Sequence, residues 1–237
     1  MNGSCRGMVP LVLMAALWPA SPAFSRLPAQ AQEGRATPRP PAPSLTRPAS
    51  PARPVNADGF IQRWLVLEPT RVPGQLTETA VRTAVENDFA VAADPLPHDG
   101  AKLTVGGNEL TWHAVDTVNY NVNLYHFAYA LNKPTSNVLF WAVTVVNAPR
   151  QMSGVRLAIG SNAASVWWVN GREATALYND RQAVIDDGVS KRLTLHKGAN
   201  VIRAAIVNAG GATDFCARFL DANDRPIKTL TATLTAR

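Results

Sequence analysis

The chain has 237 residues, of which 46% are hydrophobic, and its formal net charge is +6. This composition excludes wholesale disorder, a collagen-like chain and a multi-pass membrane protein. The excess positive charge lies in the first 56 residues, because residues 57–237 contain 17 bases and 16 acids. The basic average therefore gives the folded part no electrostatic preference for nucleic acid or for an anionic membrane.

Residues 1–23 have the features of a secretory signal peptide. Arg6 supplies a positive start, Met8 to Trp18 form an apolar run too short to span a bilayer stably, and Ser21-Pro22-Ala23 offers small residues for cleavage. We expect a secreted or periplasmic protein with no membrane span after cleavage. An uncleaved anchor or a buried helix is the alternative interpretation of the same run.

Residues 24–56 are rich in Pro, Ala, Arg and Ser and include eight prolines. A segment with so few large apolar side chains buries too little surface to offset its ordering entropy, and its prolines favour extended conformations. It is therefore predicted to be a disordered, semi-stiff linker, with a motif for a proline-binding partner as the alternative.

Loss of Cys5 with the signal leaves Cys216 alone, without an intramolecular disulfide partner. The alternating apolar surroundings of Cys216 predict a small buried side chain.

Residues 57–237 are predicted to fold as one all-β domain. Short apolar or alternating runs, punctuated by Gly, Asn, Asp and Pro, favour an antiparallel two-sheet β-sandwich. The nine expected strands are Phe60 to Leu67, Leu110 to Val118, Val138 to Val146, Val155 to Ile159, Ser165 to Val169, Arg192 to Leu195, Val201 to Val207, Asp214 to Leu220 and Pro226 to Leu234.

Two segments depart from simple alternation. Val138 to Val146 is apolar on both faces, which predicts a strand that is covered on both sides. In Thr77 to Phe89, apolar residues recur near helical spacing after a threonine that can cap a helix. We expect one short helix there, closing an end of the sandwich.

The sequence does not contain a recognisable catalytic motif. An esterase needs a nucleophile beside a base, and the Gly-x-Ser-x-Gly elbow does not occur. An unfamiliar serine–histidine triad remains the alternative, and the residues available for it are Ser153, Ser161, Ser165, Ser190, His98, His113, His126 and His196. Asp186 and Asp187 are neighbours, so on a strand they point to opposite faces and cannot alone form a glycosidase pair. We therefore favour a protein that is not an enzyme.

No zinc motif is present, and no cofactor is expected. A structural calcium ion is the alternative at one turn, where carboxylates and amides gather as they do in hard-cation sites. The turn residues are Asn179, Asp180, Asp186 and Asp187, and ordinary turn capping explains them equally well.

Two clusters are candidate ligand-binding surfaces. Sugar sites combine an exposed aromatic ring with a few planar polar side chains. Trp167 and Trp168 face opposite ways on a strand, so one is expected in the core and the other can form a platform. The first cluster is Trp168, Tyr178, Arg181 and Asp186, and the second contains Asn119, Tyr120 and Tyr125 within Asp116 to Tyr129. Core packing and amide-to-backbone bonds are the alternative for both.

Several short motifs lie at intervals along the folded part. They are Phe60-Ile61-Gln62-Arg63-Trp64, Gly160-Ser161, Trp168-Val169-Asn170-Gly171, Arg181 and Asp186, Leu195-His196-Lys197-Gly198-Ala199-Asn200, and Arg218-Phe219-Leu220-Asp221. Together they resemble the galactose-binding-domain-like jelly-roll β-sandwich found in secreted polysaccharide-degrading systems, over nearly all of residues 59–234. The chain is also similar to small exported bacterial proteins labelled acetylxylan esterase. It departs from them at Ser161-Asn162-Ala163-Ala164, where relatives commonly carry an acidic or glycine-containing turn.

The resemblance implies an exported, non-catalytic carbohydrate-binding module that acts in the breakdown of plant cell-wall polysaccharides such as xylan. Its alternative is an acetylxylan esterase that releases acetate from acetylated xylan. A third interpretation is a structural module that docks a partner enzyme. Polysaccharide and a partner enzyme are thus the expected partners, and nucleic acid is not.

Overall fold

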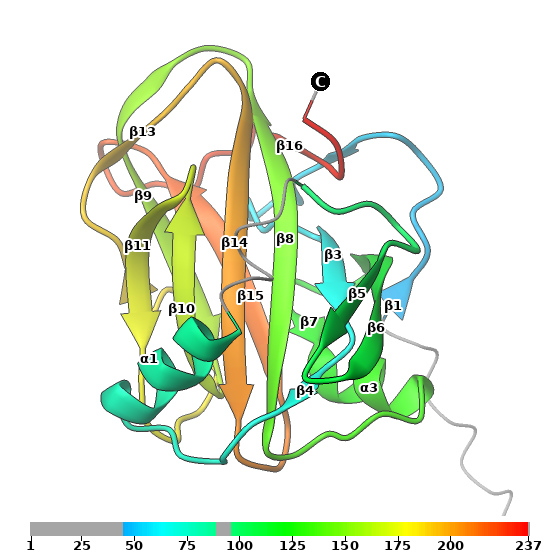
Figure 1. Cartoon of the computed structure of the whole chain (residues 1–237). Coiled ribbons are helices and arrows are strands. Elements are labelled where there is room, and N and C mark those ends of the chain that lie inside the picture. Colours follow the sequence, from blue (N-terminus) through cyan, green and yellow to red (C-terminus); the bar gives the residue numbers. More distant parts are fainter. Residues whose placement is uncertain (1–44, 89–95, 237) are drawn as a thin grey trace, which may run out of the picture. The chain divides into compact units, whose positions relative to one another are not determined.

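The computed structural model of this protein describes residues 45–88 and 96–236, in which two antiparallel sheets pack face to face (Figure 1). The larger sheet runs in the order β1 (Leu45–Thr46), β6 (Asn108–Thr117), β3 (Arg63–Leu67), β8 (Val138–Ala148), β14 (Gly198–Asn208), β10 (Ala164–Val169) and β11 (Arg172–Leu177). Four short strands join it beside this path: β2 (Arg53–Pro54), β4 (Thr70–Arg71), β5 (Lys102–Val105) and β16 (Thr231–Thr233).

The smaller sheet has the order β12 (Gly188–Val189), β9 (Met152–Ser161), β15 (Asp214–Leu220) and β7 (Val122–Asn123), and β13 (Leu193–Leu195) also pairs with β9. All of its pairings are antiparallel. The predicted all-β, two-sheet sandwich is thus confirmed. Each of the nine expected strand segments contains a strand, although the last one is reduced to β16.

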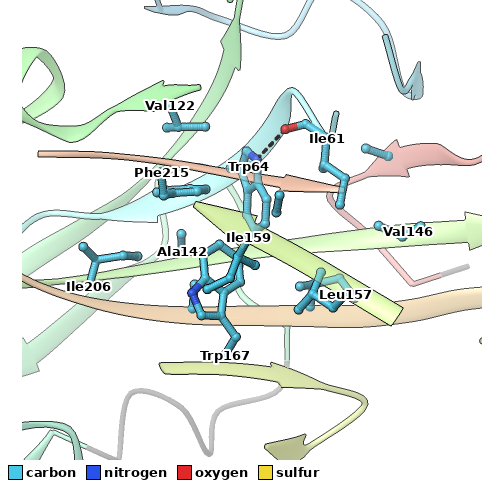
Figure 2. Close-up of a cluster of buried hydrophobic side chains, with 14 of the residues drawn as sticks. Ile61, Trp64, Val122, Ala142, Val146, Leu157, Ile159, Trp167, Ile206 and Phe215 are labelled. Atoms are coloured by element: carbon cyan, nitrogen blue, oxygen red, sulfur yellow. Dashed lines mark hydrogen bonds between the residues drawn. The ribbon is translucent and has the colours of Figure 1, made fainter. Parts of the chain in front are cut away.

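The main core lies between the two sheets and is centred on three aromatic rings. Trp64 of β3 packs edge-on against Phe215 of β15, with ring centroids 5.0 Å apart, and against Trp167 of β10 at 6.0 Å. Figure 2 shows these rings and the hydrogen bond from the Trp64 indole to the Ile61 carbonyl, which is 3.0 Å long. Because the indole donor has a partner, this ring is buried without the cost of an unsatisfied polar group.

The outer face of the larger sheet is covered as well. β8 contributes Phe140 and Ala142 to the core between the sheets, and Leu139 and Trp141 to a second apolar cluster on the opposite face. This confirms the prediction that the strand is covered on both sides. Part of the cover is helix α1 (Glu78–Asn87), which buries Val81 and Val85 in the second cluster.

Helix α1 differs from the sequence-based expectation only in its position. The Thr77 side chain accepts a hydrogen bond from the Ala80 amide, as expected of a capping threonine. The helix packs on the sheet face, however, rather than closing an end of the sandwich. A second helix, α3 (Leu124–Ala130), was not predicted, and it overlaps the segment Asp116 to Tyr129 that was selected as a candidate binding surface. No helix in the described ranges is long and apolar enough to span a bilayer.

The folded part includes a segment that was expected to belong to the linker. β1 pairs with β6, and β2 pairs with β16. Between these strands, the Ser50 carbonyl accepts a hydrogen bond of 2.7 Å from Arg63. We call residues 45–56 the strap. The expected signal peptide and residues 24–44 lie outside the described residues.

Candidate functional site

The members of the first predicted cluster occupy two different surfaces. Trp168 is half-buried on the outer face of the larger sheet and stacks on Trp141, with ring centroids 5.8 Å apart. Tyr178 lies nearby under the Arg82 guanidinium of α1, 5.7 Å from its ring centroid, and burial raises the pKa of the phenol. Trp167, the neighbour of Trp168, is in the core as one of the two was expected to be. Both Trp168 and Tyr178 thus pack within an apolar layer.

The charged members of that cluster are each paired. Arg181 donates a hydrogen bond of 3.3 Å to the Tyr178 carbonyl and forms an ion pair with Asp187. Asp186 accepts hydrogen bonds from both Nε and Nη2 of Arg218, the first at 2.9 Å. This carboxylate raises the pKa of Arg218. The bidentate geometry fixes the arginine in one orientation on the outer face of the smaller sheet.

Arg218 connects Asp186 to the second predicted cluster. Its guanidinium lies 4.8 Å from the centroid of the Phe60 ring, and the Phe60 ring lies 5.3 Å from that of Tyr120. Tyr120 is 42% exposed, whereas Phe60 is buried. We call Phe60, Tyr120, Asp186 and Arg218 the Tyr120 face. It combines a partly exposed aromatic ring with a planar charged pair.

The loop that presents Tyr120 is held by hydrogen bonds on both sides. Gln62 Nε2 donates to the Asn119 carbonyl at 2.8 Å, and Thr117 Oγ1 donates to the Asn121 carbonyl at the same distance. Gln62 in turn accepts a hydrogen bond from Arg53 of the strap. Asn119 is exposed and contributes mainly its backbone to these contacts. The tyrosine is therefore presented by a preorganised loop.

The segment that carries Asp186 packs closely against β9 at a glycine. A Cβ at Gly160 would collide with the Val184 carbonyl, so no larger residue fits at this position. Asp186 itself adopts a left-handed φ of 58°, which Asp tolerates better than most residues. Val184 and Ile185 beside it are exposed, at 54% and 44%. Sequence reasoning missed these two residues, and the only signal for them in the sequence is an aliphatic pair directly before two aspartates.

Tyr125, the last predicted residue, lies on α3. Its ring stacks on Tyr129, with centroids 6.2 Å and planes 8° apart, and Tyr129 is 71% exposed. The two tyrosines are four residues apart, so they neighbour each other on the helix surface. The Asn123 side chain caps the helix by accepting from the His126 amide at 2.7 Å. This pair is a second exposed aromatic surface.

Several of the serine and histidine residues named for a triad make other contacts. Ser190 Oγ accepts from the Leu157 amide at 2.9 Å and donates to the Lys191 carbonyl, and Ser165 accepts from the Trp167 indole. His113 contacts Glu68 at 3.3 Å, and Lys133 lies 2.9 Å from the other oxygen of that carboxylate. Over residues 45–88 and 96–236, no serine hydroxyl hydrogen bonds to a histidine ring.

The calcium hypothesis concerned Asn179, Asp180, Asp186 and Asp187. Two of its carboxylates, those of Asp186 and Asp187, each contact an arginine. Within the described part of the chain, no three His, Cys, Asp or Glu side chains converge as a metal site would require. A calcium ion at this turn stays a prediction.

Cys216 is buried, as expected, and burial raises the pKa of its thiol to about 12, which is the behaviour of an inert packing residue.

The sequence matches no protein-family profile, and no curated protein is significantly similar to it. Solved structures with a similar arrangement include the PA14 domain of the antifreeze protein MpAFP, with 11% identity over 73% of this chain and 91% of that one, at a TM-score of 0.44. A PA14 sugar-binding domain from an RTX adhesin has 10% identity over 73% and 99%, at a TM-score of 0.41.

The β-glucosidase from Kluyveromyces marxianus is similar over 52% of this chain and 16% of its own length, with 15% identity and a TM-score of 0.36. The present chain thus corresponds to a small part of that enzyme. These similarities are too low to carry an argument. The fold assignment rests on the sheet topology alone.

Proposed function

We propose that this chain is a carbohydrate-binding module and that the Tyr120 face is its binding surface. The observation that carries the proposal is the row Tyr120, Phe60, Arg218 and Asp186, in which an exposed ring adjoins a bidentate ion pair. The C–H face of a pyranose ring packs against an aromatic ring, and sugar hydroxyls exchange hydrogen bonds with planar carboxylate and guanidinium groups. Both kinds of partner are present here on one preorganised surface.

The finer proposal is that the module acts outside the cytoplasm, in the breakdown of plant cell-wall polysaccharides such as xylan. It is supported by the signal-like residues 1–23 and by the jelly-roll resemblance described above. Val184 and Ile185 beside the Tyr120 face supply apolar surface that a polymeric ligand can cover. Docking of a partner enzyme is the alternative that would be favoured if the test below found neither polysaccharide binding nor acetate release.

The test is depletion of the purified chain from solution by insoluble xylan and cellulose. Tyr120→Ala is expected to weaken binding on the order of tenfold to a hundredfold, because an aromatic anchor at the centre of a contact carries most of its free energy. Tyr120→Phe keeps the ring and is expected to retain most of the binding. Tyr129→Ala is the matched control, since it removes a still more exposed tyrosine from α3.

Three outcomes contradict the proposal. If no polysaccharide depletes the chain, the carbohydrate-binding function is wrong. If Tyr129→Ala abolishes binding and Tyr120→Ala does not, the α3 tyrosines form the site instead. If acetate is released from acetylated xylan in parallel and a Ser→Ala variant abolishes that release, the esterase alternative replaces the binding module.

A further inference from the structure

A cleft of about 630 Å³ opens between the β11 edge of the larger sheet and the β13 edge region of the smaller one. Its size is in the range of small-molecule and oligosaccharide sites. The residues that line it are Val169, Asn170, Arg172, Glu173, Ala174, Lys191, Arg192, Leu193, Thr194 and His196. None of them belongs to the Tyr120 face. We call this space the cation cleft.

The charges of the cation cleft are unbalanced. Glu173 is its only carboxylate among the described residues, and both of its oxygens accept hydrogen bonds of 3.1 Å from Arg82 on α1. Arg192 donates to the Gly154 carbonyl at 2.7 Å and lies 3.5 Å from Asp224. Arg172 and Lys191 are exposed, and neither has a carboxylate within ion-pair distance in the described chain. Two cations are thus available to an anionic ligand.

The cleft also has an apolar lining. Ala174 and Leu193 are partly buried and pack against the core between the sheets, and Val169 is a member of that core. Apolar side chains beneath charged ones suit a ligand that has both a hydrocarbon face and negative charges. A sugar ring bearing a carboxylate is such a ligand, because its ring C–H groups are apolar and its carboxylate accepts charge-assisted hydrogen bonds.

Hydrogen bonds of two asparagines connect the turns that form one wall of the cleft. Asn170, in the turn between β10 and β11, donates to Asn200 Oδ1 at 2.9 Å and accepts from the Val201 amide at 2.9 Å. Asn200 is fully buried and donates to the His196 carbonyl at 2.8 Å. The turn that precedes Arg172 is therefore joined to the turn that carries His196. This fixed wall reduces the ordering cost of binding.

From this combination we infer that the cation cleft is a second binding site, which takes a polysaccharide of uronic acids such as polygalacturonate. The inference rests on the proposed function for the sugar-binding character of the module, but it uses a different surface. Nucleic acid fits the cleft less well, because its described lining residues include no Trp, Tyr or Phe ring on which a base can stack.

The test compares two double charge reversals in the full chain by affinity electrophoresis in polygalacturonate. Arg172→Glu with Lys191→Glu is expected to weaken binding at least about tenfold, since each cation offers the carboxylates a charge-assisted hydrogen bond. Arg150→Glu with Lys228→Glu makes the same change of net charge at exposed cations outside the cleft and is expected to change binding less than about twofold. The basic N-terminal segment is identical in both variants.

Two further measurements make the result decisive. Neutral xylan is run beside polygalacturonate, and the Arg172→Glu/Lys191→Glu variant is expected to keep its xylan binding. Arg172→Gln with Lys191→Gln tests the same cations without adding negative charge, and it is expected to weaken polygalacturonate binding by a smaller factor. Thermal unfolding of each variant checks that the surface changes leave the fold intact.

The inference is overturned in three ways. Equal losses in the two reversal variants would mean that binding follows net charge alone. Equal binding of DNA, with the same dependence on Arg172 and Lys191, would make the cleft a general polyanion site. Absence of polygalacturonate binding with xylan binding retained would remove this second site and leave the proposed function standing, whereas loss of both would remove the proposed function too.

Discussion

The cations at the two ends of the larger sheet differ in burial and in ion pairing. At the β1 end, Arg63 is 1% exposed and holds the Asp116 carboxylate with two hydrogen bonds of 2.8 Å, beneath the strap. At the β11 end, Arg172 and Lys191 are exposed at the rim of an open cleft, and no carboxylate of residues 45–88 or 96–236 pairs with either of them. A buried arginine that is hydrogen-bonded to a carboxylate cannot lose that partner without a large cost to the fold, whereas exposed cations around a cleft can pair with a ligand.

The largest expected effect is at the buried end. Asp116→Asn leaves the Arg63 guanidinium buried without its counter-charge, so it is expected to lower the free energy of unfolding by about 3–5 kcal/mol. Denaturant unfolding measures the change. Asp224→Asn removes an exposed carboxylate that pairs with Arg156 and Arg192, and it is expected to cost at most about 1 kcal/mol. Similar losses for the two variants would show that burial does not distinguish these ion pairs.

A smaller stability effect is expected at the open end. Asn200→Ala removes the buried amide that joins the two turns of the cation cleft, and it is expected to cost about 1–3 kcal/mol. It is also expected to weaken polygalacturonate binding and to leave xylan binding unchanged. Asn108→Ala, in the exposed β5–β6 turn, is the control and is expected to change stability within about 0.5 kcal/mol. Unchanged polygalacturonate binding by Asn200→Ala would show that the wall needs no such link.

The smallest effect extends the comparison to Asp214, a carboxylate with no cationic partner in the part of the chain that the structure describes. Burial raises the pKa of Asp214, which accepts a hydrogen bond from Asn121. The folded state therefore holds this proton more tightly than the unfolded state, and stability falls as pH rises through the raised pKa. Asp214→Asn is expected to increase the free energy of unfolding at neutral pH, because it removes the cost of ionising a buried carboxyl. Its advantage should shrink as the pH is lowered through that pKa.

Glu68 is a carboxylate whose pKa is shifted in the opposite direction to that of Asp214. Burial raises its pKa, but hydrogen bonds from Lys133 and His113 together bring the pKa below its ordinary value. Its contribution to stability is therefore present at neutral pH and is lost as pH falls through the lowered pKa. Glu68→Gln is expected to destabilise the fold at neutral pH. Thermal unfolding followed across pH checks both variants, and shifts of the same sign would contradict the assignment.

Much of the fold follows from local patterns. The double-sided apolar run of β8 predicted a central strand, and Thr77 predicted the start of α1. β11 was missed because Arg172–Leu177 is an edge strand whose exposed and half-buried side chains need no strict alternation. The strap was missed for a different reason. Its order depends on long-range contacts with Arg63 and Asp116, which composition cannot reveal.

The candidate site was less accessible to sequence reasoning. Residues close in sequence were grouped into one candidate cluster. However, Trp168 lies on the outer face of the larger sheet, whereas Asp186 lies on the outer face of the smaller one. Conversely, Tyr120 and Asp186 are 66 residues apart and belong to one surface only because Phe60 and Arg218 link them. The aromatic and acidic residues could be selected by type, but their arrangement depends on how β15 and the segment before β3 are placed by the fold.

The tryptophans provide an internal optical probe of this protein. Four of the five described indoles, those of Trp64, Trp112, Trp141 and Trp167, are at most 2% exposed, and Trp168 stacks on Trp141. None of the five belongs to the Tyr120 face or lines the cation cleft. Intrinsic fluorescence excited at the indoles should therefore report melting of the sandwich and change little on ligand addition, so one titration can separate loss of structure from loss of affinity.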